Sequence, residues 1–349
     1  RGDAKNQTIA TYLIDGAAST LQTYQIFTNR TFDAGHNIVN QKVLTYADLD
    51  SKTFLDAQEI RSTNFYSSGV AGAQTIVTYS DAGMTKIIGA KEITNLNVSS
   101  GGNVGEIVIT TYSIASIADS GTGAISLDPK DSLTRETINN TSFDKYGNAL
   151  TQAILSEFYT VGAGFAFSEY KAVSSNTYDI HSRVTYSEIR NYNKSDGTDF
   201  RDLQVINYYN YDEFGNSKLQ TIDTYSTTII GSGFVDSKVV ENVYSNAQAA
   251  RRGNASTSTV TRYGSLDHKN ANLIDRTITN TSKFDDSGNA LIQTQDKYVF
   301  DSVFNPIKIT HSDITNSNPD ARGDAKNQTI AAYLIDGAAS TLQTYQIFT

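Results

Sequence analysis

One peptide occurs twice in this chain, and the two copies lie 321 residues apart. The run Arg1–Thr28 returns as Arg322–Thr349, and only Thr11, which corresponds to Ala332, differs. Repetition at a fixed period is the signature of repeat architectures. We therefore predict that residues 1–321 are one full period of a tandem super-repeat and that 322–349 begin the next copy. The two copies should then have the same conformation. The alternative is that one finished protein carries the same segment twice.

A shorter rhythm runs inside the long period. An aromatic residue ends a β-rich run at steps of 31 to 35 residues, and this predicts that the period contains nine or ten degenerate two-strand units of about 33 residues. The aromatic residues concerned are Tyr12, Tyr46, Tyr79, Tyr112, Phe143, Tyr178, Tyr211 and Tyr244.

The segment from Leu203 to Phe234 shows what one small unit contains. Two runs rich in β-branched and aromatic residues, 204–211 and 218–225, are separated by turn residues, and residues 230–233 turn the chain again. Connections this short join antiparallel neighbours. The prediction is an all-β fold: an antiparallel meander of hairpin repeats that forms a curved or closed, spiral or tubular, sheet. A parallel β-helix is the alternative fold, and short helical turns are conceivable only at 47–59 and 245–252.

The turns between the predicted strands share the pattern aromatic-Asp-x-x-Gly-Asn. Asp and Asn bond to nearby backbone groups, and Gly tolerates the positive φ that tight turns need. The full pattern occurs three times, at Phe143-Asp144-x-x-Gly147-Asn148, Tyr211-Asp212-x-x-Gly215-Asn216 and Phe284-Asp285-x-x-Gly288-Asn289. Degenerate forms begin at Phe32, Tyr178 and Phe300.

These turn motifs resemble those of the Rhs/YD-repeat family of large bacterial surface and toxin-encapsulating proteins. The resemblance implies hairpins that wind into a spiralling β-sheet around a hollow. It also implies an aromatic side chain that packs inward, an Asp that braces the turn, and a Gly-Asn pair that reverses the chain. The resemblance covers the turns from Phe32 to Asn305 and little of the strand sequence.

Composition excludes several classes of site. The chain has no cysteine, which excludes disulfides and thiolate sites, and its net charge of −9 argues against nucleic acid and anionic membranes as partners. The four histidines are scattered, and no catalytic motif occurs. No catalytic, cofactor or metal residue is therefore predicted. Structural calcium, with Asp48, Asp50, Asp285 and Asp286 as acidic candidates, is the one cofactor considered.

Long repetition without a reactive site favours a structural function. We predict a repeat unit of a very long extracellular fibre or cell-surface protein that is not an enzyme. Its partners would be adjacent copies of the same repeat, with lateral self-assembly as a further option, and no part of this segment would insert into a membrane. The alternatives are an adhesin or carbohydrate-binding surface module and, third, an encapsulating shell of the Rhs type.

Overall fold

The computed structural model describes residues 3–15, 18–117, 123–286, 288–319, 325–337 and 339–348. The chain forms two compact units. The first contains Arg1–Ser174 and Asn191–Phe200, and the second contains Ser175–Arg190 and Arg201–Thr349. Almost every regular element in both units is a β-strand, as the alternation of β-branched and aromatic residues predicts.

The strands follow one another through both units, and the division between the units falls within β12, within β13 and after the first residue of β14. The strands up to this division are β1 (Gln7–Asp15), β2 (Ala18–Phe32), β3 (Ile38–Tyr46), β4 (Phe54–Thr63), β5 (Ala73–Tyr79), β6 (Ile87–Val98), β7 (Val104–Tyr112), β8 (Ser116–Ile117), β9 (Ile125–Ser126), β10 (Ser132–Phe143), β11 (Ala149–Thr160) and β12 (Gly164–Tyr178).

The later strands are β13 (Val184–Tyr192), β14 (Phe200–Tyr211), β15 (Ser217–Tyr225), β16 (Phe234–Val243), β17 (Thr257–Tyr263), β18 (Leu273–Phe284), β19 (Ala290–Phe300), β20 (Pro306–Pro319), β21 (Ala325–Asp336) and β22 (Ala339–Phe348). The helical segments are α1 (Ala247–Arg251) and two single 3₁₀ turns at Pro129–Asp131 and Asn270–Asn272.

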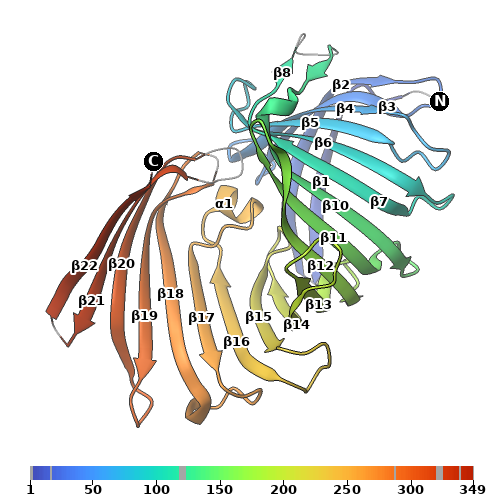
Figure 1. Cartoon of the computed structure of the whole chain (residues 1–349). Coiled ribbons are helices and arrows are strands. Elements are labelled where there is room, and N and C mark those ends of the chain that lie inside the picture. The colour runs from blue at the N-terminus through green and yellow to red at the C-terminus, as the bar shows by residue number, and fades with distance from the viewer. Residues whose placement is uncertain are drawn as a thin grey trace. The chain divides into compact units, whose positions relative to one another are not determined.

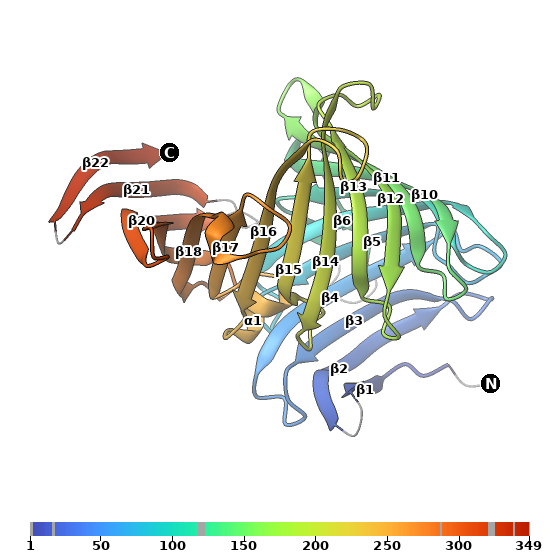
Figure 2. The same cartoon turned by 90° about the horizontal axis from the view of Figure 1, so that it is seen from below.

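The fold is an antiparallel meander, and the predicted fold class is confirmed. Within each unit the strands lie side by side in chain order and curve along their length (Figures 1 and 2). Twenty strands are assigned to one sheet, while β8 and β9 form a separate ribbon. Among the described residues, β1 pairs only with β2 and β22 only with β21, so the sheet is curved but not closed. The parallel β-helix alternative is wrong, because every described strand pair is antiparallel.

Successive turns of a meander lie alternately at its two edges, so the aromatic residues that recur along the chain do not all lie at the same edge of the sheet. The first four aromatic residues of the series lie on β1, β3, β5 and β7, whereas the next three end β10, β12 and β14. Strand β10 pairs directly with β7 in the opposite direction. The insertion 113–131, which carries β8 and β9, adds length without adding a strand to the sheet. The 31-residue step from Tyr112 to Phe143 therefore crosses from one edge to the other.

The buried core is small because most of the chain is a single layer of sheet. In the first unit a cluster of Ala57, Val77, Tyr79, Ala90 and Tyr112 is buried, and residues of the insertion 113–131 pack against it. In the second unit the buried apolar side chains include Leu203 on β14 and Ala249 on α1. Elsewhere most strand residues are only half-buried, so cross-strand side-chain pairs contribute much of the stabilisation.

The repeated peptide folds the same way in both places. Residues 7–27 form the β1–β2 hairpin, in which Gln7 lies opposite Phe27, and the register shifts between Thr11 and Tyr12. In the β21–β22 hairpin Gln328 lies opposite Phe348, and the register shifts between Ala332 and Tyr333. The pairing and the position of the bulge are identical at an offset of 321 residues. The expected equivalence of conformation is thus observed for the described residues of the hairpin, and the Thr11 to Ala332 difference leaves the register unchanged. Before the hairpin the copies differ, because residues 325–327 belong to β21 whereas their counterparts 4–6 precede β1.

Helical structure is limited to a few short segments of the described chain. The helical turn expected within 245–252 is present as α1, whereas the one expected at 47–59 is not: residues 54–59 belong to β4. These residues form a strand and not a helical turn because β4 pairs with β3 on one side and with β5 on the other. Across the described residues, we find no helix with the length and apolar character needed to span a membrane.

Candidate functional site: a row of aspartate-closed turns

Each motif turn is closed by its aspartate in the same way. In the turn between β10 and β11, Asp144 Oδ1 accepts hydrogen bonds from the backbone N–H groups of Tyr146 (2.8 Å) and Asn148 (2.9 Å). Asp144 Oδ2 accepts from Asn148 Nδ2 at 2.9 Å. The backbone N–H groups of Asp144 and Gly147 donate to the carbonyls of Asn148 and Asp144. One carboxylate thus satisfies three donors that a tight turn would otherwise leave to water.

The same frame recurs at the other motif positions. The structure places Phe143, Tyr211 and Phe284 at the last residue of a strand, and Asp, Gly and Asn in the turn that follows. Asp212 bonds to Asn216 and Asp285 to Asn289 as Asp144 bonds to Asn148. The degenerate copies at Asp33, Asp179 and Asp301 keep the Asp contacts; at Asp179, an arginine replaces the Asn side chain as donor.

The motif glycine is required by its backbone conformation. Gly147, Gly215 and Gly288 have φ of 88°, 85° and 81°, a region that residues with a Cβ rarely adopt. At Gly288 a Cβ would also lie 2.8 Å from the backbone of Ala249. The degenerate copies place His36, Ser182 and Phe304 at positive φ in the same position.

Two further turns have this frame but lack the aspartate. Ser99 takes its place between β6 and β7, where Ser99 Oγ accepts from Asn103 N at 3.0 Å. At Tyr66, between β4 and β5, only the backbone bonds to Val70 and Gly69 remain. The sequence signal that could have found them is the retained glycine, Gly102 or Gly69, three residues after the position that Asp holds in the motif.

In each unit these turns lie next to one another along one edge of the sheet. We call this arrangement the turn row. In the first unit it comprises turns 33–37, 66–70, 99–103 and 144–148, and in the second unit turns 179–183 and 212–216, the α1 connection 244–256, and turn 285–289. The turn at Asp301 has the same hydrogen bonds but connects β19 to β20 at the opposite edge.

Side chains of the turn row connect one turn to the next. Asn216 Nδ2 donates both to Asp212 in its own turn (2.8 Å) and to the carbonyl of Ala250 in α1 (2.6 Å). On the other side of α1, Asn254 Nδ2 donates to the carbonyl of Gly288 at 2.9 Å. The α1 connection, capped by Asn246, therefore takes the place of a motif turn in the row. The Asn of the motif stabilises a turn and also joins neighbouring turns.

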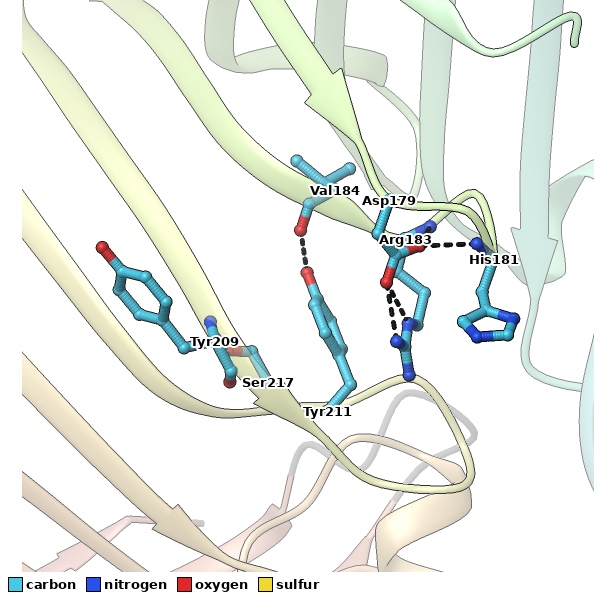
Figure 3. Close-up of polar contacts among 7 residues, drawn as sticks. All are labelled: Asp179, His181, Arg183, Val184, Tyr209, Tyr211 and Ser217. Atoms are coloured by element: carbon cyan, nitrogen blue, oxygen red, sulfur yellow. Dashed lines mark hydrogen bonds and ion pairs between the residues drawn. The ribbon is translucent and has the colours of Figure 1, made fainter. Parts of the chain in front are cut away.

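Figure 3 shows the turn at Asp179 and the side chains that join it to β14. Arg183 Nε donates to Asp179 Oδ2 at 2.7 Å, and the guanidinium lies 4.9 Å from the centre of the Tyr211 ring. The Tyr211 hydroxyl donates to the carbonyl of Val184. Burial raises the pKa of Tyr211 to about 12, so the hydroxyl keeps its proton and remains a donor. The motif aromatic thus holds the preceding turn in place.

The opposite edge carries aromatic pairs. Three loops of this edge are flanked by such pairs: Tyr46 and Phe54, Tyr192 and Phe200, and Tyr225 and Phe234, with ring centres 5.7, 5.9 and 6.1 Å apart in edge-to-face geometry. Such pairs stabilise neighbouring strands beyond the area that they bury. Carboxylates also accept backbone N–H groups at this edge, as Asp48 and Asp301 do, so the aromatic pairs add to the aspartate contacts here and do not replace them.

The turn carboxylates accept hydrogen bonds from nearby donors, and in several turns these bonds lower the pKa of the aspartate. Hydrogen bonds from Asn148 lower the pKa of Asp144, and those from Asn37 and Asn305 lower the pKa of Asp33 and Asp301. A carboxylate held as an anion by three donors is a poor general acid and has few free lone pairs for a cation. In the described part of the chain, no three acidic or histidine side chains converge as a metal site would require. Asp48, a calcium candidate, accepts from the backbone of Lys52 and Thr53.

The pKa shifts predict how stability depends on pH. A carboxyl whose pKa is lower in the folded than in the unfolded chain stabilises the fold above the unfolded value of 3.8, and this contribution is lost as pH falls through the folded pKa. We expect the urea midpoint to fall steadily below about pH 4. In Asp144→Asn this decline should be smaller, because one such carboxyl is gone. Glu136→Gln, outside the turns, is the control; an unchanged decline in Asp144→Asn would contradict the prediction.

One buried cluster contains the residue types of a nucleophilic triad but not their order. Ser237 Oγ lies 2.7 Å from His268 Nε2 and also donates to Asp223 Oδ1. In a triad the histidine lies between the serine and the carboxylate. Here the serine lies between the other two and is fully buried. The hydroxyl proton is directed at Asp223, so this cluster links β15, β16 and the 264–272 loop and does not activate a nucleophile.

Comparisons with known proteins give no family for this chain. No family model matches it, and no curated protein matches it. Among solved structures, the crystal structure of TcdB2-TccC3 shares 9% identity and a TM-score of 0.15 over 97% of this chain. That of TcdB2-TccC3-Cdc42 shares 10% identity and a TM-score of 0.18 over 96%. The chain spans about a quarter of the length of those chains, 26% and 24%. Similarity at this level carries no argument about fold or function.

Proposed function

We propose that this chain is a structural repeat unit of a very long extracellular fibre or cell-surface protein and that it has no catalytic role. One observation carries the proposal: the peptide that recurs after 321 residues forms the same hairpin, with the same register and the same bulge. A sheet that returns to its starting hairpin can be continued indefinitely by the same sequence. We further propose that the turn row corresponds to the turns of YD repeats, because its turns carry the aromatic-Asp-x-x-Gly-Asn motif.

The contacts that the polar and aromatic side chains make support a structural role for the chain. The turn carboxylates bond to backbone groups, and most tyrosines are at least half-buried between strands. Among the described tyrosines, the strongly exposed ones are Tyr12, Tyr146, Tyr209 and Tyr345. Two of these, Tyr12 and Tyr345, lie on the outermost strands β1 and β22. An aromatic patch of the kind that binds sugars would need clustered exposed rings instead.

A carbohydrate-binding module is the second candidate, because the second unit contains one polar hollow with aromatic walls. The hollow has a volume of about 280 Å³, and its lining includes Tyr244, Phe284, Asn254 and Gln293. Stacking rings with amide donors suit a sugar. A shell of the Rhs type would need an enclosed hollow, and the described strands form an open sheet.

The proposal predicts the size of the native protein. Under denaturing conditions the polypeptide isolated from its source should have a mass several times the 38.0 kDa of this chain, with increments of one 321-residue period after partial proteolysis. A single species near 38 kDa would overturn the array, and the carbohydrate-binding alternative would then be tested by glycan binding to Tyr244→Ala and native chains.

A further inference from the structure

Strand β22 has one paired side and one open side in the described part of the chain. On it, Leu342, Tyr345, Ile347 and Phe348 are 51%, 61%, 62% and 50% exposed. The same four residues on β2 (Leu21, Tyr24, Ile26 and Phe27) are half-buried. The strand sequence is identical in the two places, and the hairpin partner differs only at Thr11 and Ala332. The difference is that β3 pairs with β2 on the side that is open on β22.

Strand β1 shows the reciprocal difference. Tyr12 is 46% exposed, whereas its equivalent, Tyr333, is half-buried, and its ring centre lies 6.0 Å from that of His311 on β20. Gln328 Nε2 donates to Asn316 Oδ1 at 2.8 Å, and the equivalent Gln7 is exposed. Strand β20 pairs with β21 on the side that is open on β1. Strand β3 therefore covers on β2 the side that is open on β22, and β20 covers on β21 the side that is open on β1.

We propose that the open side of β22 binds strand β3 of a second copy of this sequence, in the register that β3 adopts against β2. This inference rests on the proposed function and names the contact by which successive repeats join. Tyr345, Gln346, Ile347 and Phe348 would lie opposite Tyr46, Thr45, Leu44 and Val43 of the second copy, as Tyr24, Gln25, Ile26 and Phe27 do within this chain.

The physical case is that of an edge strand with an apolar sequence. An unpaired edge offers a row of free N–H and C=O groups, and natural proteins protect such edges with charges, prolines or bulges. Residues 341–348 contain neither a charge nor a proline. The side chains of β3 already pack against this sequence once, so the covering strand is specified by side-chain fit as well as by backbone bonding. A sheet extended in this way has no open edge between copies.

The absence of cysteine allows a direct test. The whole chain carrying Gln346→Cys is mixed under mildly oxidising conditions with a peptide of residues 38–46 that carries Thr45→Cys. Directly opposite residues of antiparallel strands have Cα atoms about 4.5–5.5 Å apart, which is within the range that a disulfide spans. The matched control is the chain carrying Gln25→Cys, which has the same local sequence but a β2 strand already covered by β3. A second control is the peptide carrying Leu44→Cys, whose cysteine projects from the other face.

The Gln346→Cys chain should form the disulfide with the Thr45→Cys peptide about tenfold faster than either control pair does, because only this pair combines an open edge with matched faces. Equal rates would overturn the proposed contact. Faster disulfide dimerisation of the Gln346→Cys chain by itself would show that β22 pairs with another β22 and would also overturn it. The result is independent of the native mass, so the failure of this contact and the failure of the covalent array are distinguishable.

Discussion

Replacing Asp212 by alanine should lower the free energy of unfolding of the second unit by about 3 kcal/mol, since hydrogen bonds to a buried charged acceptor contribute about 1.5–3 kcal/mol each and do not add fully. Asp212 is 4% exposed and accepts from Phe214 N, Asn216 N and Asn216 Nδ2. Its loss also releases the Asn216 side chain that holds the carbonyl of Ala250. The effect should therefore extend to α1.

Urea unfolding measures the global change, and hydrogen exchange at Phe214 and Asn216 reports the turn itself. The matched control is Asp301→Ala, which removes the same three contacts from an exposed turn at the opposite edge. That variant should lose clearly less stability than Asp212→Ala, because water can replace the carboxylate. Equal losses in the two variants would show that the contacts along the turn row contribute nothing beyond closing single turns.

Replacing Glu59 by alanine should destabilise the first unit by about 3–5 kcal/mol, the cost of leaving buried charges without their partner. Glu59 on β4 is 1% exposed. Its two oxygens bind Lys42 Nζ (3.0 Å) on the neighbouring strand β3 and Arg61 Nη1 (2.9 Å) on β4. Both cations are largely buried as well, at 17% and 12% side-chain exposure, so water cannot fully replace the carboxylate.

The control for Glu59→Ala is Asp50→Ala. Asp50 pairs with Lys52 at a similar distance of 3.0 Å, but both side chains are more than 70% exposed. An exposed ion pair contributes about 0–1 kcal/mol, so this variant should unfold close to the native midpoint. Circular dichroism in urea compares the two. A loss in Glu59→Ala no larger than that in Asp50→Ala would mean that the cluster relaxes toward solvent on losing its carboxylate.

The turns could be predicted from the sequence because their chemistry is local. Asp144, Gly147 and Asn148 lie within five residues, and the bonds among them depend on little outside the turn. The turn at Tyr66 escaped prediction because its frame is held by backbone bonds alone. The hairpin of the repeated peptide was equally accessible, since the two copies differ only at Thr11 and Ala332 and hairpin register forms between residues close in the chain.

The arrangement of the turns depended on contacts that no local pattern records. The motif at Asp301 looks like the others but lies at the opposite edge, because the number of strands that precede a turn decides its edge. Across the insertion 113–131 the recurring aromatic residue moves to the other edge of the sheet while its spacing in the sequence hardly changes, because β7 pairs directly with β10. Helix α1 occupies a place in the turn row that no motif marks.

By itself, the sequence determined the all-β class, the closed turns and the recurrence of one hairpin, because side chain to backbone bonds and hairpin register form between residues close in the chain. Only the tertiary structure decided which side of that hairpin is covered. Tyr345 is exposed and Tyr24 is half-buried in the same local sequence, because β3 lies beside only one of them. How far a side chain is buried depends on which strands lie beside its own strand, and the arrangement of the whole sheet determines that.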